Sequence, residues 1–441
     1  MTENNSNTKY NYLTDNNKPF DVFIVGGYVR DKLLGLEPND VDYLVVTKDE
    51  YNVNDTIEYL LSLDFKQVGN DFPVFLDPIS GDEWALARTE RKVGVGYNGF
   101  ETQVENVSIY DDLLRRDLTI NSLAFNEETQ EYVEPLSGTS LEDIKNKVLR
   151  PTSEAFVEDP LRFIRLARMS SKLPSFEIET RDFTKLLNND IKNEIFSLSK
   201  ERLFAELSKN FETQKPSNFF GVLNDLDLLD IYFKIDLNDT SLSESIALLD
   251  FSYSMNKDKD FNITLFFLGL LAHNEKINEL LYNSESKSET YTNILDFIDE
   301  MFLTFSLPNK LSNLLAKSFF FLNSFSTFNE LELEEKIELL SFKSLKHKEE
   351  LETILNIINT FMSFKNSQLE IPLNEEERNE YFSSDTILKY FEVLDDNKSF
   401  YTLSKDIIEN QLSPNGKLDM KLKDEYILNR KLELFKNLDL E

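Results

Sequence analysis

The chain has 441 residues, a formal net charge of −33 and no cysteine. This length is enough to bury a large core and to form several domains. Without cysteine the protein forms neither disulfides nor thiolate zinc sites, which is compatible with a cytoplasmic location. The acidic excess argues against nucleic-acid binding over the whole surface, because neutralisation of phosphates by basic side chains drives that affinity.

Residues 1–20 are polar and rich in asparagine, without the apolar core of a secretion signal. We expect this segment to be a disordered tail. The longest apolar run, near 261–272, is interrupted by Asn262 and Thr264 and is too short to span a membrane. We therefore expect no membrane partner.

Residues 22–46 carry the most informative pattern in the chain. A strand is predicted over 22–25, followed by Gly26 and Gly27, a short helix and a turn. Because glycine has no Cβ, the backbone of this pair can approach a phosphate closely, and N–H groups at the start of the helix favour anions. This order of elements predicts phosphate chemistry.

A second strand is predicted over 43–46, and Asp40 and Asp42 lie where it begins. Residues two apart on a strand point to the same face. Two adjacent carboxylates repel each other unless a cation lies between them, and hard oxygen ligands beside a phosphate substrate suit Mg²⁺. We therefore predict that Asp40 and Asp42 are catalytic carboxylates that bind Mg²⁺, two ions of which would activate a hydroxyl nucleophile and stabilise a leaving pyrophosphate.

Short apolar segments separated by glycine and proline turn signals continue the strand pattern to about residue 138. Residues 88–100 contain three glycines and predict a mobile loop. Further strands are predicted over 74–76, 84–87 and 118–125.

Arg116 and Asp117 precede the last of these predicted strands. An arginine can bridge phosphate oxygens, and an adjacent aspartate can accept a hydrogen bond from a ribose hydroxyl. For the neighbouring Arg115, an ordinary surface ion pair is the expected role.

From Leu141 onward the apolar residues follow helical spacing. The segment Glu158–Arg162 opens a helix, with Pro160 near its first turn. Asp159 offers acceptors and Arg162 a planar fork of donors, so one turn apart they can meet the Watson–Crick edge of a base. Cytosine and adenine both place an amine donor beside a ring-nitrogen acceptor there, whereas uracil and guanine present a carbonyl and an N–H.

Basic residues are clustered within this acidic chain, so we expect a local positive cleft and RNA binding that is weak and strongly salt-sensitive. After about residue 210 the sequence is rich in Leu, Phe, Ile, Lys and Glu at helical periodicity and predicts an all-α region. The basic clusters are Arg88 with Arg91 and Lys92, Arg115 with Arg116, and Arg162 with Arg165 and Arg168.

Together these motifs resemble the class II nucleotidyltransferases of the polymerase β superfamily, which include the CCA-adding tRNA nucleotidyltransferases and bacterial poly(A) polymerases. The resemblance is dense over about residues 21–210. It rests on Gly26–Asp42, Phe72–Phe75, Ala87–Lys92, Arg115–Leu123, Glu158–Arg168 and Glu201–Arg202.

The resemblance implies an α+β protein: a nucleotidyltransferase head with a mixed sheet over 21–138, a helical neck over 139–210, and an all-α, tRNA-binding body and tail over 211–441. It implies that Asp159 and Arg162 act as a protein template that selects CTP and ATP. The other nucleotide-binding positions carried over from the family are Gly27, Arg30, Arg116, Asp117, Arg165 and Arg168.

The implied activity is addition or repair of the 3′-terminal CCA of tRNA from CTP and ATP, with release of pyrophosphate. The partner would be the tRNA acceptor end, not DNA; the sequence leaves the oligomeric state open. The alternatives are a bacterial-type poly(A) polymerase and a catalytically silent RNA-binding relative. The glycine-rich loop matches one that the family needs to switch from C to A addition.

Two further questions concern additional acidic and histidine residues. The candidates for the third carboxylate of the superfamily are Glu83 and Asp112, and the sequence does not favour either of them. Longer bacterial members carry an HD phosphohydrolase domain with a histidine-rich metal site, but this chain has only His273 and His347. We therefore expect no functional HD domain.

Overall fold

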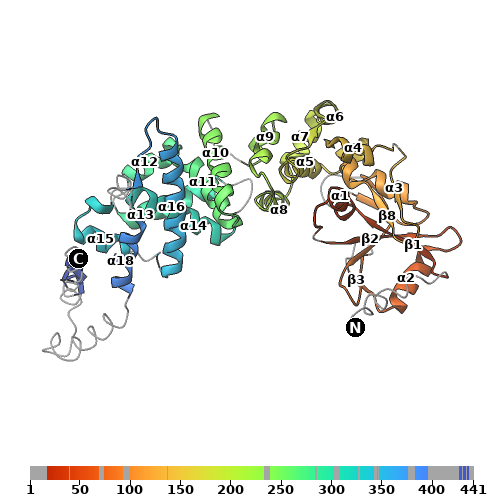
Figure 1. Ribbon diagram of the computed structural model, residues 1–441, viewed down its shortest axis with the longest axis horizontal. Helices are drawn as coiled ribbons and strands as arrows, with labels where there is room; N and C mark the ends of the chain where they lie inside the picture. Colours follow the sequence, from red (N-terminus) through yellow and green to blue (C-terminus); the bar gives the residue numbers. More distant parts are fainter. Residues whose placement is uncertain are drawn as a thin grey trace. The chain divides into compact units, whose positions relative to one another are not determined.

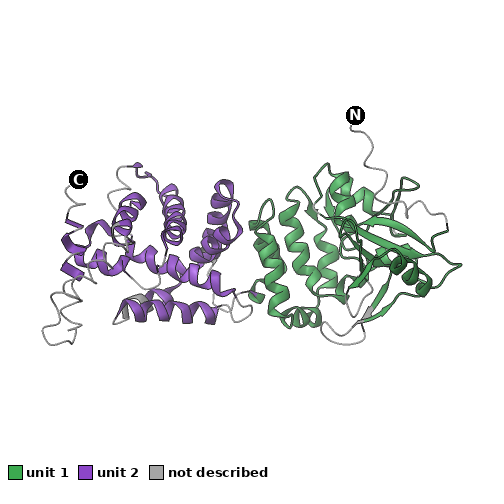
Figure 2. Ribbon diagram, turned by 90° about the horizontal axis from the view of Figure 1, so that it is seen from below, with its two compact units in different colours: residues 1–231 green, residues 232–441 purple. Residues whose placement is uncertain are grey.

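The computed structural model divides into two compact units, residues 1–231 and 232–441 (Figures 1 and 2). Each unit is described by itself. The structure describes residues 17–38, 40–68, 74–92, 100–136, 138–232, 239–283, 286–301, 307–325, 328–341, 345, 347–375, 383–395, 427–429, 431–433 and 435–436.

The first unit begins with a seven-stranded mixed sheet in the order β3-β4-β5-β2-β1-β8-β9. Strands β2 and β5 pair in parallel, and the other neighbours pair antiparallel. The strands are β1 (Phe20–Val25), β2 (Asp42–Thr47), β3 (Lys66–Val68), β4 (Val74–Leu76), β5 (Glu83–Leu86), β8 (Ala124–Asn126) and β9 (Glu131–Val133).

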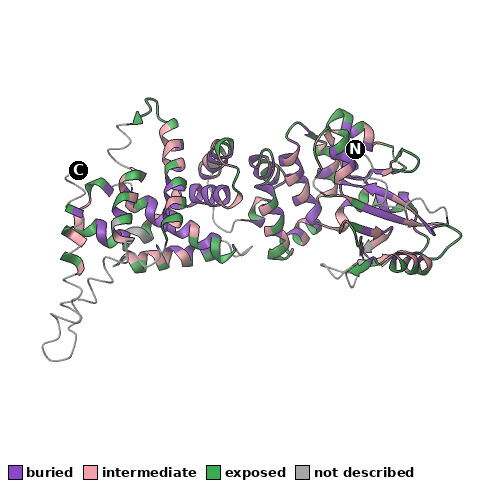
Figure 3. Ribbon diagram, turned by 60° about the horizontal axis from the view of Figure 1, so that its bottom comes forward, coloured by how far each residue is buried: buried purple, intermediate pink, exposed green. Residues whose placement is uncertain are grey.

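The central strands β1 and β2 each contribute three consecutive buried residues to the core, whereas burial alternates along β5 (Figure 3). On β5, Trp84 and Leu86 are buried, and Trp84 stacks on Tyr43 of β2 with ring centroids 4.9 Å apart. Because side chains alternate along a strand, Glu83 is left outside this core. Helices α1 (Gly27–Leu33), α2 (Val53–Ser62) and α3 (Ile109–Leu114) complete the head, and α2 and α3 both begin with a capping box.

Strands predicted from the sequence are confirmed at β1, β2, β4 and β5, but the one predicted over 118–125 is wrong. A 3-10 helix occupies Thr119–Asn121, and only β8 at its end is a strand. The turn is closed by backbone hydrogen bonds from Asn121 to Leu118 and from Ser122 to Thr119. All three of its side chains are buried, and a short buried segment has no periodicity that distinguishes a helical turn from a strand.

The rest of the first unit is mostly helical. The central helix α5 (Leu161–Lys172) packs against α8 (Lys200–Asn210) and α9 (Ser217–Asp225), burying Phe163, Ile164 and Leu166. The remaining elements are the hairpin of β6 (Thr89–Lys92) and β7 (Phe100–Gln103), the parallel pair of β10 (Val148–Leu149) and β11 (Glu177–Ile178), the helices α4 (Ser140–Asn146), α6 (Thr180–Leu186) and α7 (Asn189–Phe196), and the 3-10 helices η2 (Glu154–Glu158) and η3 (Leu229–Ile231).

The regular elements that the structure describes in the second unit are all helices, which confirms the expected fold class of an α+β head followed by helices. The predicted packing of Phe319–Phe321 is confirmed, because all three side chains are buried. None of the described helices is long and apolar enough to cross a membrane. The helices are α10 (Asp239–Met255), α11 (Lys259–Ala272), α12 (Glu275–Asn283), α13 (Lys287–Met301), α14 (Asn309–Phe325), α15 (Leu333–Leu340), α16 (Lys348–Ser367) and α18 (Ser384–Asp395), with a 3-10 helix η4 (Phe328–Glu330).

Candidate active site

A cavity of about 540 Å³ lies in the first unit, among the glycine pair, the start of β2, α5 and α8. Nine of its lining side chains are basic and four are acidic, so the positive cleft expected from the sequence is present in a chain of net charge −33. The lining residues are Gly26, Gly27, Arg30, Asp42, Arg88, Glu90, Arg115, Arg116, Asp117, Asn121, Asp159, Leu161, Arg162, Arg165, Arg168, Met169, Lys172 and Arg202.

Nearly all of the predicted site residues meet in this cavity. Of the catalytic and nucleotide-binding residues only Asp40 is outside the lining; it is exposed and lies two residues before Asp42, the first residue of β2. Glu83 and Asp112, the candidates for the third carboxylate, also lie outside the lining. The predicted glycine loop falls largely on residues 93–99, which lie outside the described part of the chain.

The first glycine of the pair, Gly26, is required by its surroundings. Gly26 has a φ of 74°, a backbone conformation that residues other than glycine rarely adopt. A Cβ at this position would also come within 3.3 Å of Arg116 Nη1. Gly26 therefore lets the backbone pass close to the guanidinium of Arg116 in the cavity.

Asp42 lies near two other carboxylates, those of Glu83 and Asp40. It is opposite Glu83 in the parallel β2–β5 pair, so the two side chains share one face of the sheet. Although Asp42 is exposed at the cavity, the surrounding protein removes hydration and raises its pKa; Arg116 opposes this shift, while Glu83 and Asp40 add to it.

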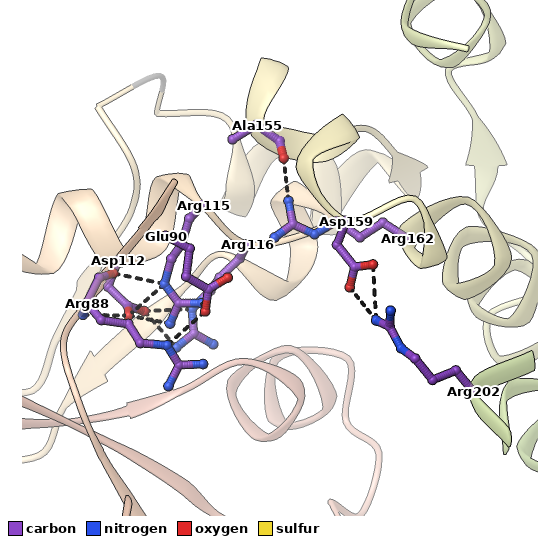
Figure 4. Close-up of polar contacts among 9 residues, drawn as sticks. All are labelled: Arg88, Glu90, Asp112, Arg115, Arg116, Ala155, Asp159, Arg162 and Arg202. Carbon is purple, nitrogen blue, oxygen red and sulfur yellow. Dashed lines mark hydrogen bonds and ion pairs between the residues drawn. The ribbon is translucent and has the colours of Figure 1, made fainter. Parts of the chain in front are cut away.

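The two candidates for the third carboxylate have different surroundings. Asp112 is fully buried and accepts hydrogen bonds from Arg115, from Arg116 and from the Arg88 N–H (Figure 4). Burial raises the pKa of Asp112, but the two arginines outweigh it and hold the pKa below its ordinary value. Asp112 therefore orders arginines, and Glu83 is the acid that shares the face of Asp42.

The donor set around Asp42 suits a hard divalent cation. Its neighbours Asp40 and Glu83 are close enough to raise its pKa, and a cation would relieve that repulsion. Across the described ranges, no group of three or more acidic, histidine or cysteine side chains is arranged to hold a metal. Mg²⁺ usually binds through one or two carboxylates together with substrate phosphates, and Asp40 and Asp42 meet that requirement.

Asp117 is buried and tightly held. Its Oδ1 accepts from Leu118 N (2.8 Å) and Asn121 Nδ2 (3.0 Å), and its Oδ2 accepts from Arg165 Nε (2.9 Å) and Nη2 (2.8 Å). Burial raises its pKa, but Arg165 and these hydrogen bonds outweigh it and hold the pKa well below the ordinary value. A ribose hydroxyl at Asp117 would have to share or displace one of these donors.

Asp159 and Arg162, predicted to act together, form no side-chain bond with each other in the described structure. Asp159 accepts from Arg202 Nη2 at both oxygens (3.1 and 2.8 Å) and from Leu161 N (3.1 Å). Arg162 donates from Nη1 to the Ala155 carbonyl oxygen at 2.6 Å (Figure 4). Each side chain is thus held from a different side.

Arg162 combines burial with unused hydrogen-bonding capacity. Its side chain lines the cavity but is only 7% exposed, and burial lowers its pKa, partly opposed by Asp117, Asp159 and Glu90. Among the described residues its guanidinium donates only to Ala155. A guanidinium has five N–H donors, so a ligand in the cavity finds donors available here.

Some lining residues were not predicted as site residues. The sequence suggested a surface ion pair for Arg115, but the structure places its side chain in the cavity lining. The side chain is 15% exposed and contacts Asp112 and Glu90. Asn121 accepts from Arg30 and donates to Asp117, because the 3-10 turn places it between them. Arg202 had a signal in the sequence, since Glu201–Arg202 belongs to the motifs of the resemblance.

Comparison with known proteins agrees with this geometry. Residues 22–150 match a family model described as the poly A polymerase head domain. A CCA-adding enzyme of Coxiella burnetii is 45% identical over 213 residues, which are 48% of this chain and 54% of that protein. A multifunctional CCA protein of Shewanella denitrificans is 44% identical over 215 residues, 48% of this chain and 50% of that protein. The chain thus spans about half the length of the curated relatives it matches.

Solved structures share the fold over a larger part of the chain. The CCA-adding enzyme of Bacillus stearothermophilus in complex with CTP has a TM-score of 0.57 at 19% identity, covering 95% of this chain and 89% of that one. That of Thermotoga maritima complexed with tRNA has a TM-score of 0.55 at 19% identity, covering 94% and 87%. At these identities the likeness is one of fold.

Proposed function

We propose that the chain is a CCA-adding tRNA nucleotidyltransferase of class II, on the likeness of its N-terminal half to a family model, to a CCA-adding enzyme and to a multifunctional CCA protein. It adds or repairs the 3′-terminal CCA of tRNA from CTP and ATP and releases pyrophosphate. No nucleic acid acts as a template. The partner we propose is the tRNA acceptor end; one solved structure of similar fold is a CCA-adding enzyme complexed with tRNA.

The observation that carries this proposal is the buried Arg162 guanidinium, with its unused donors, beside the Asp159 carboxylate. An acceptor–donor pair of this kind matches the amine and ring nitrogen of cytosine and adenine. Uracil or guanine would place a carbonyl against Asp159 and an N–H against Arg162, leaving groups unpaired in a buried site. Such mismatches cost about 1–3 kcal/mol per group.

The cations of the cavity fit a nucleoside triphosphate. Arg30, Arg116, Arg165 and Arg168 all line the cavity, together with Gly27 of the glycine pair. A triphosphate brings several negative charges into this positive surface, where planar guanidinium groups can hold its oxygens with paired hydrogen bonds. We assign these residues to nucleotide binding.

Asp40 and Asp42 would hold Mg²⁺. Glu83, opposite Asp42 on β5, is our choice for the third carboxylate of the superfamily, although the described structure does not arrange the three acids as one metal-binding group. When bound, the cation lowers the pKa of the attacking hydroxyl and neutralises charge on the phosphates. In the reaction the 3′-hydroxyl oxygen of the tRNA forms a bond to the α-phosphorus, and the bond from that phosphorus to the pyrophosphate oxygen breaks. The chain's own residues orient the nucleotide, since phosphoryl transfer depends mainly on positioning and charge stabilisation.

The test is an incubation of the full chain with tRNA that lacks its 3′ CCA, Mg²⁺ and the four nucleotides, singly and together, followed by sequencing of the products. The expected product is tRNA extended by C, C and A and no further. A run of adenosines would instead support a poly(A) polymerase, and no extension would support a silent relative.

A further inference from the structure

We infer that helix α8 positions the nucleotide-reading residues, with Arg202 setting the choice of base and Glu206 setting the binding of the triphosphate. This inference rests on the proposed function and assigns its specificity to two further residues. Helix α8 packs on α5, and residues 202 and 206 are four apart, so both lie on one face of the helix.

Arg202 acts on the carboxylate of Asp159. One guanidinium nitrogen of Arg202 lies 3.1 and 2.8 Å from the two Asp159 oxygens, and the Leu161 N–H holds Oδ1 from the other side. Both side chains of the ion pair are about one quarter exposed. A carboxylate has about four acceptor positions, so one remains for the amine of a base while the contacts to Arg202 and Leu161 fix its direction.

Glu206 acts on the arginines instead. Its side chain is only 6% exposed; Oε2 lies 2.5 Å from Arg168 Nε, and Oε1 lies 3.6 Å from Arg165 Nη1. Arg165 is held at its other end by Asp117. Glu206 therefore keeps two like-charged guanidinium groups in place where they would otherwise repel each other.

The two contacts predict different kinetic effects. The position of the Asp159 carboxylate matters only for contact with the base edge. Loss of the Arg202 contact that fixes this position therefore changes which nucleotide is chosen. The positions of Arg165 and Arg168 matter for the triphosphate, which is the same in every nucleotide. A general loss of stability would lower all rates together and would separate neither effect.

The experiment measures single-nucleotide incorporation of CTP and UTP into tRNA lacking CCA, with kcat and KM for each. For Arg202→Met we expect the CTP to UTP ratio of kcat/KM to fall by about tenfold, the effect of losing one charge-assisted hydrogen bond. Arg202→Lys, which keeps a cationic donor, should recover part of the ratio. For Glu206→Gln we expect KM to rise by about tenfold for both nucleotides with the ratio unchanged.

The controls come from the same helix. Lys200→Met and Lys209→Met each remove a positive charge at an exposed position outside the cavity lining, and both should behave as wild type. An unchanged ratio in Arg202→Met and Arg202→Lys would overturn the role of Arg202. A KM that stays or falls in Glu206→Gln, or a ratio that shifts there, would overturn the role of Glu206. Failure of the wild-type chain to add C or A would instead refute the proposed function.

Discussion

Replacement of Arg162 by methionine tests the proposed selection of the base most directly. Methionine keeps an unbranched apolar stem that fills the same space, but it removes every guanidinium donor. Arg162 is 7% exposed, and among the described residues its guanidinium donates a hydrogen bond only to Ala155. The main interaction that the substitution removes is therefore the hydrogen bond to a bound base. A hydrogen bond to a charged group contributes about 1.5–3 kcal/mol.

This energy translates into a kinetic effect, since 1.4 kcal/mol corresponds to a factor of ten. We expect kcat/KM for CTP and ATP to fall about 10- to 100-fold while the lower value for UTP changes little. The discrimination between CTP and UTP should therefore fall by about the same factor. The assay is single-nucleotide incorporation on tRNA lacking CCA, with all four nucleotides measured in separate reactions.

The matched control is Arg181→Met, the same chemical change at an exposed position of α6 outside the cavity lining. It should leave both rate and discrimination unchanged. A cooperative thermal unfolding transition of Arg162→Met, close to that of wild type, would establish that the variant is folded. A folded Arg162→Met protein with the wild-type ratio of CTP to UTP would refute the assignment of Arg162 to the base edge.

Other predictions follow from the charges of the first unit. Asp42→Asn should abolish nucleotide addition without lowering the melting temperature, because it removes a carboxylate whose neighbours Glu83 and Asp40 repel it; near wild-type turnover would contradict a catalytic role. Asp117→Asn should lower the free energy of unfolding by about 3 kcal/mol near neutral pH. The Asp117 pKa is depressed in the folded state, so its contribution is complete above the ordinary pKa and is lost as pH falls; urea unfolding should show the difference from wild type shrinking from pH 6 to pH 3, and a constant difference would refute the ion-pair account. The affinity for tRNA should fall at least tenfold between about 50 and 200 mM salt, measured by fluorescence anisotropy, and a flat profile would argue against binding at the cationic cavity. The purified chain should show no metal-dependent 2′,3′-cyclic phosphodiesterase activity, because its two histidines, His273 and His347, are too few for a histidine-rich metal site; hydrolysis abolished by His273→Ala would contradict this.

The sequence by itself determined where the chemistry lies. The glycine pair, Asp42, Arg116, Asp159 and the arginines of α5 are short motifs whose spacing reflects local structure, and the fold brings all of them to one cavity. Local patterns carry this information because a turn requires glycine and a helix places residues three or four apart on one face.

Only the tertiary structure distinguishes the surroundings of Glu83 from those of Asp112, because these surroundings depend on strand register and burial. Glu83 lies opposite Asp42 through the parallel pairing of β2 with β5, whereas Asp112 is buried among arginines. The same holds for Arg115, whose sequence context resembles that of a surface ion pair. The contacts of α8 with Asp159 and with the arginines of α5 join residues about 40 positions apart, and no periodicity in the sequence specifies which charged groups meet over that separation.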